Sequence, residues 1–169
     1  MELETGKYVV YRMSEICRIE GFEKKCADGV NEREYLVLSP ISSGSARYYV
    51  PKETAGERIR ALLSREEILD LIHGMVGAEE WRSNPTERKQ LQSEALSSGD
   101  YGRIASMLRG IYLEKQRREA QGKRLNSTDE RMMKQAESMI NGEFSFVLGI
   151  KPEEVPEFIS RKIQETEQK

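Results

Sequence analysis

Cysteine, histidine and aromatic residues are scarce in this sequence, and each shortage excludes a class of protein. Its 169 residues include two cysteines (Cys17 and Cys26), one histidine (His73) and 7% aromatics. A disulfide framework or a histidine-based zinc cluster needs more of these residues than the chain has. No apolar run is long enough to span a bilayer, and no secretory leader is recognisable. We therefore expect a protein of a reducing, bacterial cytoplasm that has no membrane partner and no metal or other cofactor.

Motifs that support catalysis are also missing. The sequence contains no G-x-x-x-x-G-K-[ST], G-x-G-x-x-G or G-x-S-x-G segment, so the usual phosphate-binding loops and nucleophile turns are excluded. Paired acids occur at Glu66-Glu67, Glu79-Glu80 and Glu153-Glu154, near expected helix starts, where carboxylates interact favourably with the helix dipole. A hydrolase or transferase that uses paired glutamates is the minor alternative. We expect neither enzymatic activity nor a small-molecule substrate.

Charge is nearly balanced overall but unevenly distributed. Lysine and arginine total 27 against 29 acids, a net charge of −2, so bulk attraction cannot hold the chain on a nucleic acid. Between Arg103 and Lys134, however, basic residues outnumber acidic ones, whereas glutamates dominate after Gln135. A phosphate backbone is one partner for this positive segment. An ordinary solvated helix surface is the other interpretation.

Short alternating segments dominate the first third of the chain. Strands are predicted over residues 8–11, 16–22, 34–38 and 47–50. Turn-forming residues separate them at Asp28-Gly29 and over Ser42–Ser45, and Pro51 ends the fourth strand. Four strands at this spacing predict a small antiparallel β-barrel over residues 1–52.

Beyond about residue 60 the apolar period changes to that of helices. Ser64 and Glu67 form a capping box, Ser127 is expected to cap a later helix, and Gly149 to end it. Apolar residues recur at helical spacing in each segment, for example Ile104, Leu108 and Ile111. We predict an α+β protein with a barrel, a linker over residues 53–61 and an all-α bundle of about five helices over residues 62–169.

The single tryptophan, Trp81, has polar neighbours. Arg82 follows it directly, and Arg88 and Lys89 come soon after. One interpretation is that Trp81 seals the helical core, as large aromatics usually do. The other is that it is a partly exposed wedge that contacts a base step while the basic residues hold phosphates. The sequence alone leaves both open.

Both parts of the chain resemble one known family in an ordered set of segments. In the first part the matching segments are Gly6–Tyr11, Arg18–Gly21, Glu34–Leu38 and Val50-Pro51. In the second part they are Trp81, Ser98–Asp100, Leu108–Tyr112, Gly122–Leu125, Asp129–Arg131 and Phe146–Ile150. This set resembles CarD-family transcription regulators over nearly the whole chain.

The resemblance implies a Tudor-like barrel that docks on the RNA polymerase β subunit, a module shared with the transcription-repair coupling factor. It also implies a helical domain that contacts promoter DNA at the upstream edge of the transcription bubble and changes the stability of the open complex. Such a protein shifts the equilibrium between closed and open promoter by no more than the difference in its affinity for the two forms. Its DNA contact would not be sequence-specific, and it would be associated with the bacterial nucleoid. A protein–protein adaptor with no DNA contact is the main alternative.

The resemblance also assigns residues, with two departures. The polymerase-binding residues would be Lys24, Lys25, Arg47 and Tyr49; Tyr49 stands where the family often has an arginine, and Arg47 precedes it on the same expected strand. The DNA-binding residues would be Trp81, Arg82, Arg88, Lys89, Lys123, Arg124 and Arg131. After the first strand, Tyr11–Cys17 lacks the family's glycine turn, and Trp81 lies farther ahead of Ser98–Asp100 than in the best-known members.

Overall fold

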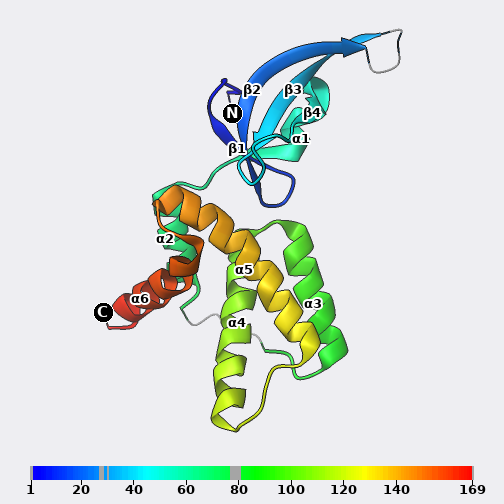
Figure 1. Ribbon diagram of the computed structural model, residues 1–169. Helices are drawn as coiled ribbons and strands as arrows, with labels where there is room; N and C mark the ends of the chain where they lie inside the picture. Colours follow the sequence, from blue (N-terminus) through cyan, green and yellow to red (C-terminus); the bar gives the residue numbers. More distant parts are fainter. Residues whose placement is uncertain (1, 27–28, 30, 77–80, 169) are drawn as a thin grey trace. The chain divides into compact units, whose positions relative to one another are not determined.

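The computed structural model describes residues 2–26, 29, 31–76 and 81–168 (Figure 1). The chain divides between Leu62 and Leu63 into two compact units, which we call the sheet unit and the helical unit. Residues 53–61, which the sequence pattern predicts to be a linker, fold as part of the sheet unit. Asp28 of the first expected turn and the pair Glu79-Glu80 lie outside the described residues.

The sheet unit contains five antiparallel strands in the order β4-β3-β2-β1-β5. Their bounds are β1 Tyr8–Tyr11, β2 Glu15–Cys26, β3 Glu32–Pro40, β4 Tyr48–Pro51 and β5 Ile59–Ala61. β2 and β3 are longer than the others, and β3 pairs along its whole length with Cys17–Cys26 of β2, with an irregularity between Ile19 and Gly21. In Figure 1 they extend together as a two-stranded ribbon beyond β1 and β4.

One face of this sheet forms the core of the unit. Because side chains alternate along a strand, Val9, Cys17 and Leu36 point to the same side, where they are buried. Between β4 and β5 the chain turns through a 3-10 helix, η1 (Lys52–Thr54), and a short helix, α1 (Ala55–Arg58), which add Ala55 to that core. The described strands form an open sheet with edges β4 and β5, so the expectation of a closed barrel is not met. The η1 and α1 turn occupies the chain between the two edges, and no pairing joins β4 to β5 among these strands.

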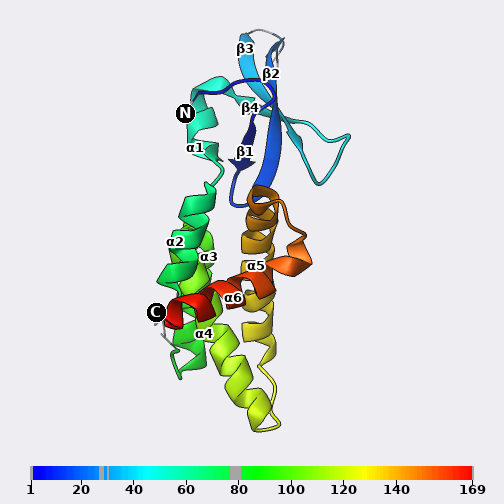
Figure 2. The same ribbon diagram turned by 90° about the vertical axis from the view of Figure 1, so that its left-hand side faces the viewer.

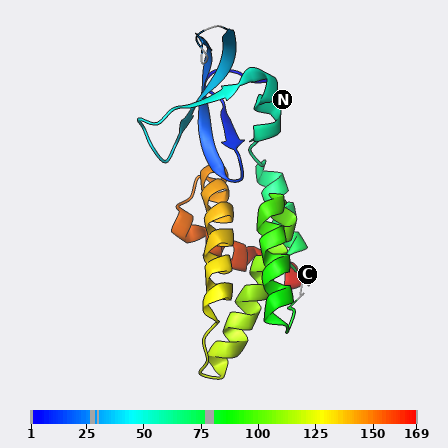
Figure 3. The same cartoon turned by 90° about the vertical axis from the view of Figure 1, so that its right-hand side faces the viewer.

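The helical unit contains five α-helices and one short 3-10 helix in its described part. Their bounds are α2 Arg65–Gly74, α3 Pro85–Ser98, α4 Tyr101–Ala120, α5 Ser127–Leu148, η2 Pro152–Glu154 and α6 Val155–Glu167. α4 packs against both α3 and α5 and runs antiparallel to them (Figure 1), and Figure 3 shows α3 and α5 side by side. α6 packs on α2 and crosses the bundle (Figure 2). No helix in the described ranges has the length and apolar character needed to cross a membrane.

The helix ends show why the sequence folds this way. Ser64 and Glu67 form the predicted capping box at the start of α2. Gly149 ends α5 with φ of 69°, a left-handed conformation that favours glycine. The prediction that Ser127 caps α5 is wrong. Asn126 takes that place, because its side chain accepts the Asp129 amide, and Ser127 is the first helical residue.

The core of the helical unit is built from the predicted apolar stripes. Ile104, Leu108 and Ile111 of α4 are buried, and so are the α5 residues Met132, Met133, Ala136, Met139, Ile140 and Phe144. Glu143 of α5 is also fully buried, and its Oε1 accepts the backbone N–H of Leu63 at 2.8 Å. This bond fixes the first residue of the helical unit to the α5 helix.

Candidate functional site

In the sheet unit, two of the predicted polymerase-binding residues share one face. Tyr49 lies directly opposite Val37, and Lys25 lies opposite Arg33, so strand alternation places Lys25, Tyr35, Val37 and Tyr49 on the same side. The Lys25 Nζ lies 3.3 Å from the centre of the Tyr49 ring, a cation–π contact. Both side chains are exposed. We call this the Tyr49 face; it lies on the side of the sheet opposite the cluster of Val9, Cys17 and Leu36, and Val37 on this face is itself fully buried.

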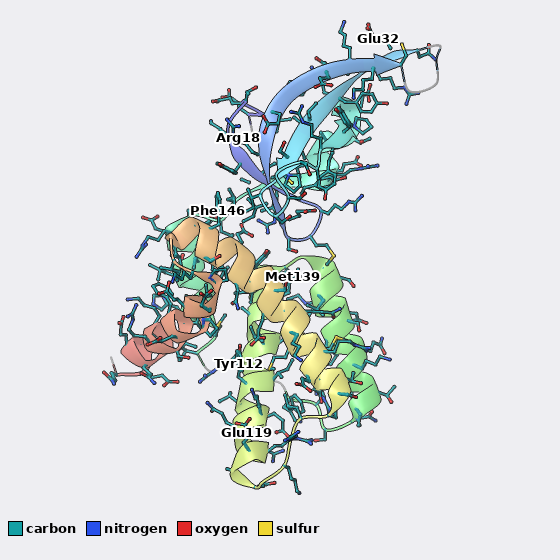
Figure 4. All side chains as sticks on the ribbon, viewed as in Figure 1. Arg18, Glu32, Tyr112, Glu119, Met139 and Phe146 are labelled. Atoms are coloured by element: carbon teal, nitrogen blue, oxygen red, sulfur yellow. The ribbon has the colours of Figure 1, made fainter. Side chains whose placement is uncertain are left out.

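The other two predicted residues lie elsewhere. Lys24 points to the opposite side from Lys25 and forms an exposed ion pair with Glu32 at 3.7 Å. Figure 4 shows Glu32 near the far end of the ribbon. Arg47 is exposed but precedes β4, so the expectation that it shares a strand with Tyr49 is wrong. The structure therefore brings Lys25 and Tyr49 together and separates Lys24 from both.

In the helical unit, Arg88 holds Trp81 in place. The guanidinium carbon lies 4.2 Å from the centre of the Trp81 ring. Nε and Nη2 donate to the two carboxylate oxygens of Asp129 at 2.9 and 2.8 Å, and Nη1 donates to the carbonyls of Arg82 and Ser83. Only 5% of Arg88 is exposed. The prediction that Arg88 contacts DNA phosphates is therefore wrong, because its donors are used inside the protein.

Asp129 binds Arg88 and two further side chains. In the sequence it appears only as an acid in the first turn of a helix. Besides Arg88, its carboxylate accepts the Gln92 Nε2 at 3.1 Å and the Asn126 Nδ2 at 2.6 Å. The Gln92 amide is thereby oriented, since only its nitrogen can donate to a carboxylate. Its other atom, Oε1, is buried and has no hydrogen-bond partner among the described residues.

Trp81 forms one wall of a cavity of about 560 Å³ beside α3 and α4. Its ring is partly buried and packs against the helical core. The apolar part of the lining comes from Leu91, Ala95, Met107 and Ile111, and the polar part includes Gln92, Asp100, Arg103 and Ser106. Trp81 thus combines features of both interpretations, since it covers core residues and also faces an open hollow.

The remaining predicted DNA-binding residues are on the surface. Arg82, Lys89, Lys123, Arg124 and Arg131 are all exposed. They come from α3, the segment before α3, the loop before α5 and α5 itself. The structure therefore distributes these cations over several elements of the helical unit.

Part of the positive segment is neutralised internally. Glu114 of α4 is buried, and Arg117 and Arg118 donate to its carboxylate at 2.7–2.9 Å. The Arg117 hydrogen bond is the main cause of the lowered pKa of Glu114. Nearby, the Tyr112 hydroxyl donates to Glu137 of α5, and Figure 4 shows Tyr112 and Glu119 along α4. The sequence could not show that these two arginines pair with a buried acid.

Neither unit offers an obvious metal site in its described part. No group of three or more histidine, cysteine, aspartate or glutamate side chains is placed to hold a metal ion in the ranges that the structure describes. Cys17 is buried and Cys26 is exposed, and neither forms a disulfide. The candidate sites are therefore the Tyr49 face and the surface around Trp81.

Comparison with known families agrees with this division of the chain. The model of the CarD-like/TRCF RID domain matches residues 3–63, and the model of the CarD C-terminal domain matches residues 67–160. The second match alone covers more than half of the chain, and the protein belongs to the CarD family. The family indicates interaction with RNA polymerase and regulation of transcription, and both matched domains are of regulatory or interaction types rather than catalytic ones.

Proposed function

We propose that the sheet unit binds the β subunit of RNA polymerase and that the helical unit contacts promoter DNA at the upstream edge of the transcription bubble, without reading its sequence. The protein would then change the lifetime of the open complex. The observation that carries this proposal is the match of both CarD modules, in order, to the two structural units. The protein would act in a bacterial cytoplasm, close to the nucleoid.

The Tyr49 face is the proposed polymerase-binding surface. It combines an exposed aromatic ring with an exposed cation in direct contact, on the side of the sheet opposite the cluster of Val9, Cys17 and Leu36. Aromatic side chains contribute strongly to binding at the centres of interfaces, and a neighbouring lysine adds attraction for an acidic partner. Arg47 lies just before the same edge strand and would flank this surface.

Exposed cations of the helical unit support the proposed DNA contact. Arg82, Lys89, Lys123, Arg124 and Arg131 would bind phosphates, which position a protein on DNA without reading bases. Trp81 would contact a base at the bubble edge. Arg88 would act as a positioning residue, because it stacks on the Trp81 ring and ties the segment to Asp129.

A binding assay with purified polymerase tests the first half of the proposal. The double variant Lys25→Glu/Tyr49→Ala should weaken retention on the polymerase β subunit about tenfold, because it removes both groups of the Tyr49 face. Lys24→Glu is the matched control, since the same charge reversal falls on the opposite side of the same strand. Equal weakening in both variants, or full retention of the double variant, would contradict the proposed docking face.

DNA with an unpaired upstream fork tests the second half. Lys123→Glu/Arg124→Glu should lower affinity and reduce the salt slope by roughly 0.9 for each phosphate that the protein no longer neutralises. Lys151→Glu/Arg161→Glu reverses two other exposed charges of the helical unit and serves as the control. With polymerase present, the first variant should also lose the effect on open-complex lifetime. An adaptor without DNA contact would show no fork binding in any variant.

A further inference from the structure

We infer that the cavity beside Trp81 is a binding site for one unpaired nucleobase, with the phosphate of the same nucleotide held by Arg103. This inference adds detail to the proposed DNA contact. It rests on the proposed function only in taking promoter DNA as the source of the nucleotide. It differs from a wedge in that the base enters a cavity of the protein, rather than the protein side chain entering the base stack.

The size and lining of the cavity fit a flat ring. Its volume of about 560 Å³ lies within the range of roughly 300–1,000 Å³ that small-molecule sites occupy. Trp81 supplies an aromatic surface, and Leu91 and Met107 supply apolar contacts. Arg88 stacks on the Trp81 ring and is itself fixed by Asp129, so the ring is held in place before a ligand arrives. Bases stack on such fixed aromatic side chains.

The unpaired acceptor of Gln92 specifies what the ligand must provide. Gln92 lines the cavity with only 4% of its surface exposed, and its Oε1 lacks a partner among the described residues. A buried acceptor without a donor is unfavourable, and a ligand N–H group that reached Oε1 from the cavity would satisfy it. Nucleobases carry such groups on the edges that base pairing occupies. An unpaired base therefore offers a donor that a paired base has already used.

Arg103 supplies the charge that a phosphate requires. Its side chain lines the cavity and is exposed, and it forms no ion pair with any residue in the described ranges. The acid nearest to it in sequence, Asp100, is already used as a helix cap, since its Oδ1 accepts the amides of Gly102 and Arg103 at 2.8 and 3.1 Å. A guanidinium binds phosphate through paired hydrogen bonds. The cavity thus joins an aromatic wall, an unpaired acceptor and a cation.

Gly110 allows the cavity to be filled without disturbing the core. It lines the cavity from α4, and a Cβ added there would meet no atom of the described residues within 4 Å. Gly110→Leu should therefore fill the open space beside Trp81, where Gly110 borders both this cavity and a neighbouring hollow. Replacing a helical glycine also favours the helix. Thermal unfolding should show that this variant is at least as stable as the wild type.

Tryptophan fluorescence of the full chain gives a direct readout, because Trp81 is the only tryptophan. The probes are deoxyadenosine monophosphate, deoxyribose 5-phosphate without a base, deoxyadenosine without a phosphate, and a short single-stranded oligonucleotide. We expect the monophosphate and the oligonucleotide to quench Trp81 and the base-free sugar phosphate to have no effect. Deoxyadenosine should bind about tenfold more weakly than the monophosphate, a difference of about 1.4 kcal/mol.

Variants distinguish the cavity from general DNA binding. Gly110→Leu and Arg103→Glu should each weaken binding of the monophosphate at least tenfold, whereas Arg65→Glu, the same reversal at an exposed position outside the cavity lining, should leave it unchanged. Quenching by both nucleotide and oligonucleotide supports capture of a base from a DNA strand. Quenching by the free nucleotide but not by the oligonucleotide supports a binding site in the cavity whose ligand is a free nucleotide.

Two results would overturn the inference. One is the absence of quenching by either the monophosphate or the oligonucleotide in the wild type, and the other is unchanged affinity in Gly110→Leu. If Gly110→Leu binds forked DNA as the wild type does and still prolongs or shortens the open complex, the cavity has no part in DNA contact and the proposed function stands. Weaker fork binding in Lys123→Glu/Arg124→Glu alone supports the function independently of the cavity.

Discussion

Buried acids in the helical unit are each matched to particular donors. Glu114 accepts from Arg117 and Arg118, Asp129 from Arg88, and Glu143 from the Leu63 amide. A buried carboxylate is tolerated only when its oxygens are satisfied in this way. These acids therefore contribute to the folded structure of the helical unit.

Glu114 gives the stability of the protein a pH dependence of known sign. Its folded-state pKa lies below the ordinary value of 4.5, so its contribution is complete above that value and is lost as the pH falls through the folded pKa. Glu114→Gln should lower the free energy of unfolding by roughly 1–2 kcal/mol near neutral pH. The difference from the wild type should shrink in urea titrations as the pH falls from 4.5 through the lower, folded-state pKa. A constant difference over that interval would contradict this assignment.

The two cysteines should differ sharply in reactivity. Burial raises the pKa of the Cys17 thiol to about 12, and the side chain lies in the core of the sheet unit. Cys26 is exposed at the end of β2. A maleimide at about neutral pH should modify one thiol per native chain and two per unfolded chain. Peptide mapping should find the native label on Cys26, and a label on Cys17 would show that the sheet core is open.

The type of a residue alone does not show which charged side chains are exposed to solvent and can bind a partner. Arg88 and Lys89 are neighbours in sequence, yet one is buried on Asp129 and the other is exposed. The partner of Arg88 lies 41 positions away, on a different helix. Only the fold brings such residues together, which is why the sequence could place cations in a segment but could not say which of them face solvent.

Helices were predicted more accurately than strands. The periodic apolar residues of α4 and α5 are buried as expected, because a long helix repeats its pattern over many turns. β5 was missed because Ile59, Arg60 and Ala61 are too few to show alternation. The cap of α5 was assigned one residue too late, since Asn126 and Ser127 are both good capping residues and only geometry decides between them.

The cap of α5 provides a test at the scale of a single helix. Asn126→Ala removes the acceptor of the Asp129 amide and the donor to the Asp129 carboxylate. We expect it to lower the free energy of unfolding by about 2 kcal/mol, at the upper end for the removal of a cap. Ser127→Ala, at the adjacent exposed position, should change it by no more than about 0.5 kcal/mol. Chemical denaturation measures both, and equal effects would contradict the observed cap.

The two units each have a core of their own, and this fixes where the chain can be divided. Residues 55–61 contribute Ala55 and Ile59 to the sheet core and add β5 to the sheet edge. A fragment ending at Leu62 should therefore fold, whereas one ending at Lys52 should not. The fragment from Leu63 onward should keep its helical circular dichroism. A folded fragment of residues 1–52 would contradict the role of β5.

The sequence pattern predicts two modules joined by a linker over residues 53–61, whereas the structure includes those residues in the sheet unit. Lys52 to Ala61 contains charged residues and a glycine, which are typical of a linker, and its structural role depends on β5 pairing with β1. That pairing joins positions about fifty residues apart, Val9 with Ala61, and cannot be read from local pattern. Polymerase contact was suggested by family resemblance, not by any single residue.

The covalent connection between the units is very short. Ala61 is held in the sheet by its pairing with Val9, and the Leu63 amide is held by Glu143, which leaves Leu62 between two anchored neighbours. A tether of this length converts a second binding event into an intramolecular one, at an effective concentration in the millimolar range or above. Once one unit has bound its partner, the other unit can bind a second ligand for which its own affinity is weak. Cutting the chain at Leu62 would abolish that advantage even if both halves stayed folded.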